Sequence, residues 1–267
     1  FPAHCVEDRN PPYDVGQLNL DVMESCGENV QDGGTWTDHF GIHNYDRSVG
    51  AMLSGAVARA HDRAGLPEGR LRARFSGSAG QSFGCWNAPG VTLLLEGEAN
   101  DYVGKGMSGG QIILTTPESD REQARQNVIC GNACLYGATG GEFFANGQAG
   151  ERFAVRNSGA VAVIEGAGHH ACEYMTGGSV AILGPTGPNL AAGMTGGELF
   201  LLDQNNLVER YLNREFVEST RLEDHDDPAA MNRLRRMISD HVEATGSEWG
   251  QRVLDRWEMM LGYWVYI

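Results

Sequence analysis

Several features that would each indicate a particular class of protein are rare or missing in this sequence. Lys and Arg together number 20 against 35 Asp and Glu, so the formal net charge is −15. A surface this negative repels phosphate backbones and anionic membranes, which makes nucleic acid and membranes poor candidate partners. No apolar run approaches the ~18–20 residues of a membrane span, and no signal peptide is visible. We therefore expect a cytoplasmic protein.

Cysteine is sparse, and its spacing matches no metal or disulfide motif. No CxxC pair occurs, and in a chain of this length scattered cysteines are typical of free thiols in a reducing compartment. Cys130 and Cys134 have three residues between them, a spacing that zinc and iron–sulfur motifs do not favour for a lone pair, so we interpret them as buried thiols. The first residue is Phe1 rather than methionine, so we expect a fragment, a processed product or an excised domain. The six cysteines are Cys5, Cys26, Cys85, Cys130, Cys134 and Cys172.

Glycine, in contrast, is abundant and periodic. The chain has 37 glycines, roughly twice the average usage of about 7 %. Gly140, Gly159, Gly177 and Gly196 are spaced by 19, 18 and 19 residues, and each follows a Ser or Thr. The series extends back to Gly109 and Gly90, and deleting about a dozen residues from the polar stretch 117–126 would restore the period between Gly109 and Gly140.

A second set of glycines confirms the register of this repeat. Gly97, Gly147, Gly166 and Gly184 each stand seven residues after an anchor glycine, and a short apolar run lies between the two columns. Such runs, bounded by turn residues, predict β-strands that are too short to be helices. One strand in every 18–19 residues cannot bury its own face, so the copies must stack into a β-solenoid.

We expect the repeat glycines to occupy corners where the backbone adopts positive φ, which costs other residues about 1–2 kcal/mol. On this reasoning Gly177→Val destabilises the fold. The residues just before the anchors should form a ladder of stacked hydroxyls: Ser108, Thr139, Ser158, Thr176 and Thr195. The predicted turn glycines are Gly90, Gly97, Gly109, Gly140, Gly147, Gly159, Gly166, Gly177, Gly184 and Gly196.

Each predicted strand has three consecutive apolar residues, so its middle residue points out of the solenoid. Both faces of that sheet should therefore be covered, by helices of this chain together with another domain. The outward column consists of Leu94, Ile113, Phe144, Val163, Ala181 and Phe200.

Helices are predicted on both sides of the repeat. Residues 1–70 form an N-terminal extension with an amphipathic helix over 46–64, residues 71–210 form the solenoid, and residues 211–267 form closing helices. Asp227 and Pro228 suit the start of a helix that ends at Gly246, and Ser247 suits the cap of a last helix. Terminal helices protect the unpaired edges of the end coils.

Three motifs resemble functional sites, but each has a structural explanation. Residues 104–109 match GxGxxG, yet a strand follows where a dinucleotide site needs a helix, and no Ser or Thr follows Lys105 as in a P-loop. Residues 77–84 lack the GxSxG nucleophile elbow. A cluster of His169, His170, Cys172 and Glu173 lacks a second spaced pair of metal ligands. We therefore predict no catalytic, cofactor-binding or metal-binding residue.

Long segments of the chain resemble the C-terminal, GXGXG-containing domain of the glutamate synthase large (alpha) subunit. The matching segments are NYDRSVG at 44–50, GSAGQSFG at 77–84, ANDYVGKGMSGG at 99–110, LYGAT at 135–139, AGERFAVRNSG at 149–159 and EYMTGG at 173–178. The resemblance runs from about residue 20 to the end, with a looser match over 1–43 and a histidine at 169 where an acidic residue is expected. It implies a right-handed parallel β-helix.

The resemblance also implies a function. The whole enzyme converts glutamine and 2-oxoglutarate into two glutamates, using a glutaminase domain, a synthase domain with FMN and an iron–sulfur cluster, and electrons from a reduced nicotinamide or ferredoxin. This chain would be the structural domain between them, with no cofactor of its own and possible contact with a small flavoprotein subunit. Two alternatives stay open: a stand-alone subunit like those of formylmethanofuran dehydrogenase or N-methylglutamate synthase complexes, and a metal protein using His169, His170 and Glu173.

Overall fold

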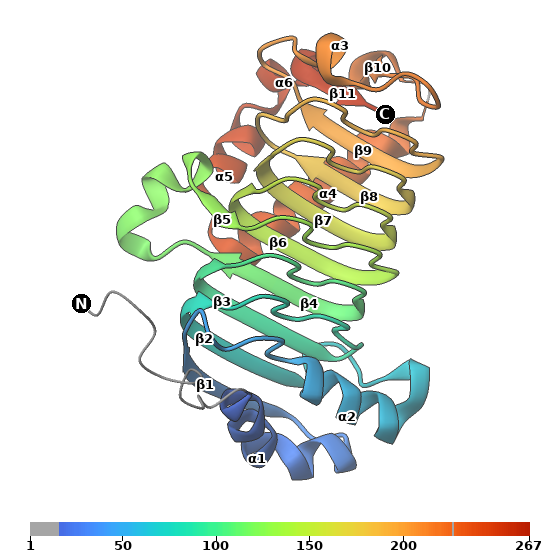
Figure 1. Ribbon diagram of the computed structural model, residues 1–267. Coiled ribbons are helices and arrows are strands. Elements are labelled where there is room, and N and C mark those ends of the chain that lie inside the picture. Colours follow the sequence, from blue (N-terminus) through green and yellow to red (C-terminus); the bar gives the residue numbers. More distant parts are fainter. Residues whose placement is uncertain (1–15, 226) are drawn as a thin grey trace, which may run out of the picture.

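A stack of parallel strands runs along the molecule, as the glycine period predicts. In the computed structural model, which describes residues 16–225 and 227–267, each strand of the stack pairs in parallel with the next (Figure 1). The register joins equivalent positions of successive repeats, so the fold is a parallel β-solenoid. The stacked strands are β1 (Trp36–Ile42), β2 (Leu71–Ala79), β3 (Val91–Ala99), β4 (Ser108–Thr115), β6 (Gly140–Ala149), β7 (Ser158–Ala167), β8 (Thr176–Ile182) and β9 (Gly196–Leu202).

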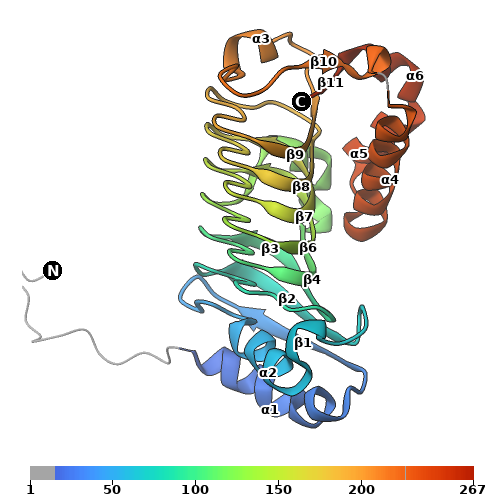
Figure 2. The same ribbon diagram turned by 90° about the vertical axis from the view of Figure 1, so that its right-hand side faces the viewer.

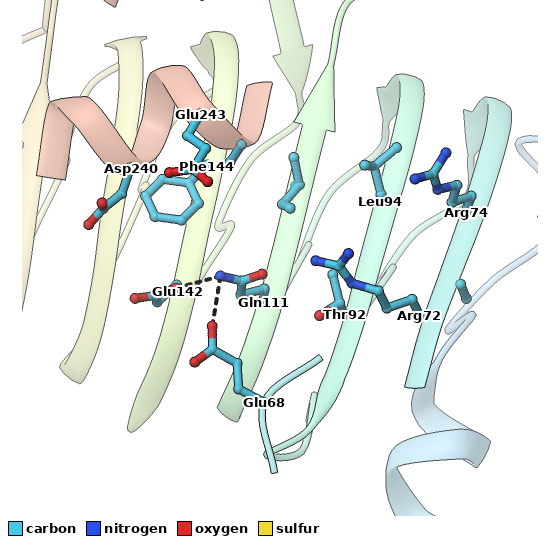
Figure 3. A pocket seen from close by; sticks show the side chains of 13 residues that line it. Glu68, Arg72, Arg74, Thr92, Leu94, Gln111, Glu142, Phe144, Asp240 and Glu243 are labelled. Atoms are coloured by element: carbon cyan, nitrogen blue, oxygen red, sulfur yellow. Dashed lines mark hydrogen bonds between the residues drawn. The ribbon is translucent and has the colours of Figure 1, made fainter. Parts of the chain in front are cut away.

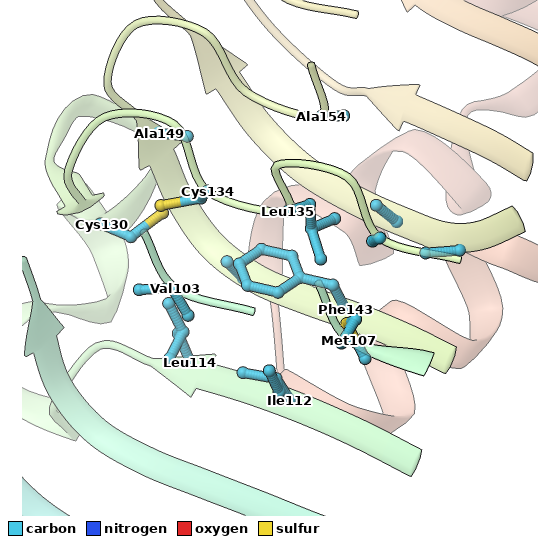
Figure 4. Packing of buried hydrophobic residues seen from close by; sticks show 14 of the residues in the cluster. Val103, Met107, Ile112, Leu114, Cys130, Cys134, Leu135, Phe143, Ala149 and Ala154 are labelled. Atoms are coloured by element: carbon cyan, nitrogen blue, oxygen red, sulfur yellow. The ribbon is translucent and has the colours of Figure 1, made fainter. Parts of the chain in front are cut away.

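The interior of the solenoid is filled by apolar columns in register. Phe143, for example, is fully buried, and Figure 4 shows it among Leu135, Ile112 and Val103. Because equivalent residues lie one coil apart, each apolar residue of a column packs against the equivalent residues of the coils before and after it. One such column contains Leu93, Ile112, Phe143, Ala162, Val180 and Leu199.

The solenoid begins earlier than the sequence predicts. Strand β1 pairs in parallel with β2 over its full length, from Trp36 opposite Leu71 to Ile42 opposite Gly77, so a coil lies inside the segment expected to be an extension. Helix α1 (Gln17–Asp32), which the sequence analysis missed, packs with α2 (Ala51–His61) at this end. Helix α2 is shorter than the predicted 46–64, because Gly50 before it has a φ of +92° and the last turn tightens into a 3-10 helix at Asp62–Ala64. Residues 1–15 of the predicted extension lie outside the described residues.

The closing helices are confirmed, together with an unpredicted strand. Helix α4 (Pro228–Thr245) is capped by the Asp227 side chain, which accepts from the Ala229 N–H at 2.9 Å, and it ends at Gly246 with a φ of +68°. Ser247 caps α5 (Glu248–Asp255), which leads into α6 (Trp257–Met260). Strand β11 (Trp264–Tyr266) then pairs antiparallel with β9 and with β10 (Thr220–Arg221), which covers the edge of the last coil. A short helix, α3 (Val208–Tyr211), precedes β10.

The glycines are required for a different reason from the one predicted. Positive φ is found at Gly90 (+88°) and Gly97 (+144°), but not at the eight other predicted turn glycines. At Gly177, for instance, an added Cβ would lie 2.4 Å from the carbonyl oxygen of Ser158 in the preceding coil. The close approach of successive coils therefore excludes a side chain there, and the correction applies to Gly109, Gly140, Gly147, Gly159, Gly166, Gly177, Gly184 and Gly196.

Left-handed backbone instead falls on neighbouring residues, several of which carry side chains. The residues after four anchors, Gly110, Gly141, Gly178 and Gly197, have φ between +67° and +92°. In the turns before β7 and β8, residues such as Arg152, Ala154 and Tyr174 also have positive φ. The predicted hydroxyls do not bond to one another: Ser108, Thr139 and Ser158 each donate to a carbonyl of the preceding coil at 3.3–3.4 Å.

The irregular gap in the repeat is an insertion that projects from the stack. Its polar residues form the 3-10 segment η2 (Glu118–Gln126), followed by the short strand β5 (Val128–Cys130), which pairs with β3 and β6. Figure 1 shows this segment in green, standing out beside the coils. Strands β4 and β6, on either side of the insertion in the sequence, pair directly with each other from Gln111 opposite Glu142 to Leu114 opposite Ala145.

Candidate interaction surface

The outer face of the sheet is only partly covered by the chain's own helices. Phe144, Val163 and Phe200 of the predicted outward column are buried in a second apolar cluster, beside Leu234 of α4 and Trp257 of α6. Helix α4 contacts β4, β6, β7 and β8, and Figure 2 shows α4 and α5 alongside this part of the stack, away from β1 and β2. The prediction that this column is covered is therefore confirmed from Ile113 to Phe200.

The rest of the face forms an open groove of about 480 Å³ at the C-terminal end of α4. Leu94, the first member of the outward column, lies here and is only half-buried. Figure 3 shows the groove running across the strands from Arg72 and Arg74 of β2 to Glu142 of β6, with Asp240 and Glu243 of α4 at its far end.

Charges of opposite sign line the two ends of this groove. Arg72 and Arg74 are exposed, and neither forms an ion pair with a residue that the structure describes. At the acidic end, Gln111 donates to Glu142 at 2.7 Å and to Glu68 at 3.4 Å. Burial, and then the charge of Glu142, raise the pKa of Asp240 above its ordinary value.

Sequence reasoning missed this groove, although the sequence contains a signal for it. The outward positions of β3 to β9 are mostly apolar, whereas β2 alternates buried Leu71, Ala73 and Phe75 with exposed Arg72 and Arg74. Alternation of this kind is typical of a strand that the chain's own helices leave uncovered. The acidic residues of α4 join the groove only through tertiary packing.

The residues of the GxGxxG match lie at a corner of the solenoid, just before β4. Lys105 sits over the rings of Tyr102 and Tyr136, at 5.2 and 5.9 Å from their centroids. Trp86 and Tyr174 are also exposed, at 62 % and 52 %. Segment 77–84 similarly spans the end of β2 and the turn into the next coil.

The histidine-rich turn does not bring together the side chains of His169, His170, Cys172 and Glu173, the four residues that resemble a metal site in the sequence. The Cys172 side chain is fully buried, and burial raises its pKa to about 12. Glu173 instead lies 3.5 Å from His170 and 3.2 Å from Arg152, while His169 lies 3.8 Å from Glu151. Within residues 16–225 and 227–267, no group of three or more His, Cys, Asp or Glu is arranged to hold a metal ion.

The other described cysteines are also buried free thiols, as predicted. Contact with the Cys134 thiol, together with burial, raises the pKa of Cys130. Cys5 lies outside the described residues. No helix in the described part of the chain is both long and apolar enough to span a membrane.

Comparison with known proteins identifies similar sequences. A family model described as "GXGXG motif" matches residues 19–267, close to the start predicted for the resemblance. The chain is 48 % identical over 245 residues to ferredoxin-dependent glutamate synthase 2 of Synechocystis, covering 91 % of this chain and 15 % of that protein. It is 50 % identical over 229 residues to the ferredoxin-dependent enzyme of Cyanidium caldarium (86 % and 14 %), and 48 % identical over 226 residues to glutamate synthase [NADH] of Schizosaccharomyces pombe (85 % and 11 %).

The chain thus corresponds to one segment of these relatives and spans about a seventh of their length or less. The family match covers the whole solenoid, both terminal groups of helices and the groove. The chain therefore belongs to the GXGXG motif family.

Proposed function

We propose that this chain is the C-terminal domain of a glutamate synthase large subunit, and that it is a scaffold for the glutaminase and synthase domains. Those domains would convert glutamine and 2-oxoglutarate into two glutamates, in the cytoplasm. The solenoid supplies a rigid surface to which they bind, and it contributes no reacting group.

The chemistry of the described side chains supports this division of labour. Iron–sulfur ligation needs accessible thiolates, whereas the described cysteines are buried and burial raises the pKa of Cys26 and Cys172 to about 11 and 12. The residues present do not fit the cluster, so we assign it, with FMN, to other domains. The relatives carry the matching segment within much longer chains, which favours a fused domain over a stand-alone subunit.

The half-covered sheet is the observation that carries the scaffold proposal. The outward side chains are buried from Ile113 to Phe200, but the face opens into the groove at Leu94. A parallel sheet with apolar side chains on both faces is stable when other elements cover both of them. We assign the missing cover to another domain of the same polypeptide, because most of the length of the relatives lies outside this segment. Arg72 and Arg74 form no ion pair with the described residues, so the surface that binds here should carry carboxylates.

Charge reversal at the groove tests this assignment in the full-length protein. In the variant Arg72→Glu/Arg74→Glu, we expect faster proteolytic release of this domain and lower glutamate formation. The matched control is Arg59→Glu/Arg63→Glu, which makes the same charge change at exposed positions on and just after α2. Equal release rates and activities for the two variants would argue against docking at the groove.

A second experiment tests the absence of a catalytic centre. The purified 267-residue chain should show neither glutaminase nor glutamate-forming activity, even with added FMN. Turnover by this chain alone would overturn the scaffold proposal.

A further inference from the structure

The insertion that breaks the repeat builds two small cavities that the solenoid does not need. Segment η2 lies against α5, and a cavity of about 350 Å³ lies between them. A second cavity of about 250 Å³ adjoins it, and both are lined by Arg125, Gln126, Glu165 and Trp249. The larger one has the volume of a small-molecule site, for which about 300 Å³ is the lower bound.

Glu165 is an unusual residue to find in the wall of these cavities. One residue beyond the pairs of the ladder, the two earlier coils have the uncharged Thr115 and Asn146 at its position, and the next two coils have the buried Leu183 and Leu202. Glu165 is only 2 % exposed, and its Oε1 accepts from the Ser247 hydroxyl and lies 3.4 Å from His241 Nε2.

The second carboxylate oxygen of Glu165, Oε2, has no hydrogen-bond partner among the residues that the structure describes. A buried carboxylate oxygen without a donor is costly, so a donor is expected to occupy the cavity.

Guanidinium groups of η2 also line the cavity. Arg125 stacks over the Trp249 ring at 4.3 Å, and the indole N–H is fixed by its bond to the Leu183 carbonyl at 2.7 Å. Arg121 reaches the C-terminus of α4, since a Cβ at Gly246 would lie 3.6 Å from its Nη1. Its buried Nε has no hydrogen-bond partner in the described part of the chain.

Charge in the cavity wall slightly favours an anionic group. Arg252 and Arg256 also line it, against the carboxylates of Glu122, Glu165 and Glu248. Arg252 is already paired with Glu248 at 3.3 Å. The wall therefore has one more guanidinium than carboxylate. Among the described residues, it also contains an acceptor without a partner, Glu165 Oε2 of β7, and a donor without a partner, Arg121 Nε of η2.

We infer that the cavity between η2 and α5 binds a free α-amino acid as its zwitterion. The ammonium group donates to Glu165 Oε2, and the carboxylate accepts from Arg121 and Arg125. A simple anion leaves Glu165 without a donor and adds negative charge beside it, while a simple amine leaves the guanidiniums unpaired. A ligand that carries both groups on one carbon supplies a donor for Glu165 and an acceptor for the guanidiniums together.

Hydrogen exchange in the full-length protein tests the inference at the site itself. L-glutamate, L-glutamine and L-alanine are the probes; glutarate lacks the ammonium group, 4-aminobutyrate separates the two charged groups, and inorganic phosphate is an anion alone. We expect at least one α-amino acid to slow exchange about threefold or more in both segments, 118–126 and 248–255, and the three comparison compounds to leave it unchanged. Because the readout is confined to these two segments, it does not depend on the proposed reaction or on binding elsewhere.

Two substitutions complete the test. Arg125→Gln removes the guanidinium that stacks on Trp249 at the cavity, and we expect at least tenfold weaker half-saturation when protection is measured relative to the ligand-free variant. The control Arg63→Gln, at the other end of the solenoid, keeps the parent response. Protection by glutarate or phosphate equal to that by the amino acids would overturn the zwitterion assignment. Absence of protection by all three amino acids, or its persistence in Arg125→Gln, would overturn the site.

Discussion

Substitution of two glycines by alanine separates the two reasons for which a solenoid requires glycine. At Gly177 the backbone φ is not in the left-handed region, but an added Cβ would lie 2.4 Å from the Ser158 carbonyl oxygen and 3.0 Å from its carbon. At Gly137 the φ is +63°, and no heavy atom lies within 4 Å of an added Cβ. The first position is thus limited by contact between coils and the second by backbone conformation alone.

The expected costs differ enough to be measured. Alanine at position 177 must push two coils apart against the N–H bonds from Thr176 (2.9 Å) and Gly177 (3.3 Å) to Asn157 O. Overpacking of this kind costs about 1–3 kcal/mol, and each weakened hydrogen bond adds up to about 1 kcal/mol, so we expect a loss of about 3 kcal/mol. Alanine at position 137 should lose only about 1 kcal/mol, since Ala133 and Leu135 already adopt the same left-handed conformation in that turn.

Urea unfolding of the purified chain, followed by circular dichroism, measures both losses. Gly159→Ala provides a replicate, because its Cβ would lie 2.3 Å from the Thr139 carbonyl oxygen. If Gly137→Ala costs as much as Gly177→Ala, close approach between coils is not what selects glycine at the anchors.

Other predictions concern the helices and the thiols. Leu234→Ala, in the interface between α4 and the sheet, should lower the free energy of unfolding by about 3 kcal/mol, and Asp227→Ala by about 1 kcal/mol through loss of the α4 cap; urea titration measures both, and a smaller loss for Leu234→Ala than for Asp227→Ala would contradict the packing described. Burial raises the pKa of Cys172 from 9.0 to about 12, so the fold favours the neutral thiol, and this contribution is complete below pH 9 and lost as the pH rises from 9 towards 12. The urea midpoint should therefore fall above pH 9, and less steeply in Cys172→Ala; equal slopes would exclude Cys172 as a source of the fall.

The repeat was predictable because it depends on local chemistry. Glycine columns and three-residue apolar runs recur at positions that the strand ladder later joins, so register and strand identity followed from spacing alone. The conformation of each glycine was not predictable in this way. Gly177 and Gly178 are adjacent and of the same type, yet only Gly178 has positive φ, because the choice depends on where the preceding coil lies.

The groove and the cavities depend on contacts between distant parts of the chain. Asp240 and Glu142 are 98 positions apart in sequence, and they share the groove only because α4 lies back across the sheet. The insertion at 117–126 was visible as a break in the period, but nothing in its composition indicated that Arg125 would stack on Trp249. Sequence reasoning therefore found the solenoid and missed the surfaces that its irregular parts create.

Glu165 carries a charge at a position of the repeat that holds uncharged Thr115 and Asn146 in the two earlier coils and leucines in the next two. Its pairing with His241 is buried on both sides. Replacing a buried pair of ionisable residues by apolar residues of similar size is often neutral or stabilising by about 1–4 kcal/mol. We therefore expect Glu165→Leu/His241→Leu to unfold at the same or a higher urea concentration than the parent chain, while the amino-acid-dependent exchange protection of 118–126 and 248–255 disappears. A marked loss of stability in this double variant would mean that Glu165 is retained to hold α4 and α5 on the sheet, and the case for a ligand at its free oxygen would lose its physical basis.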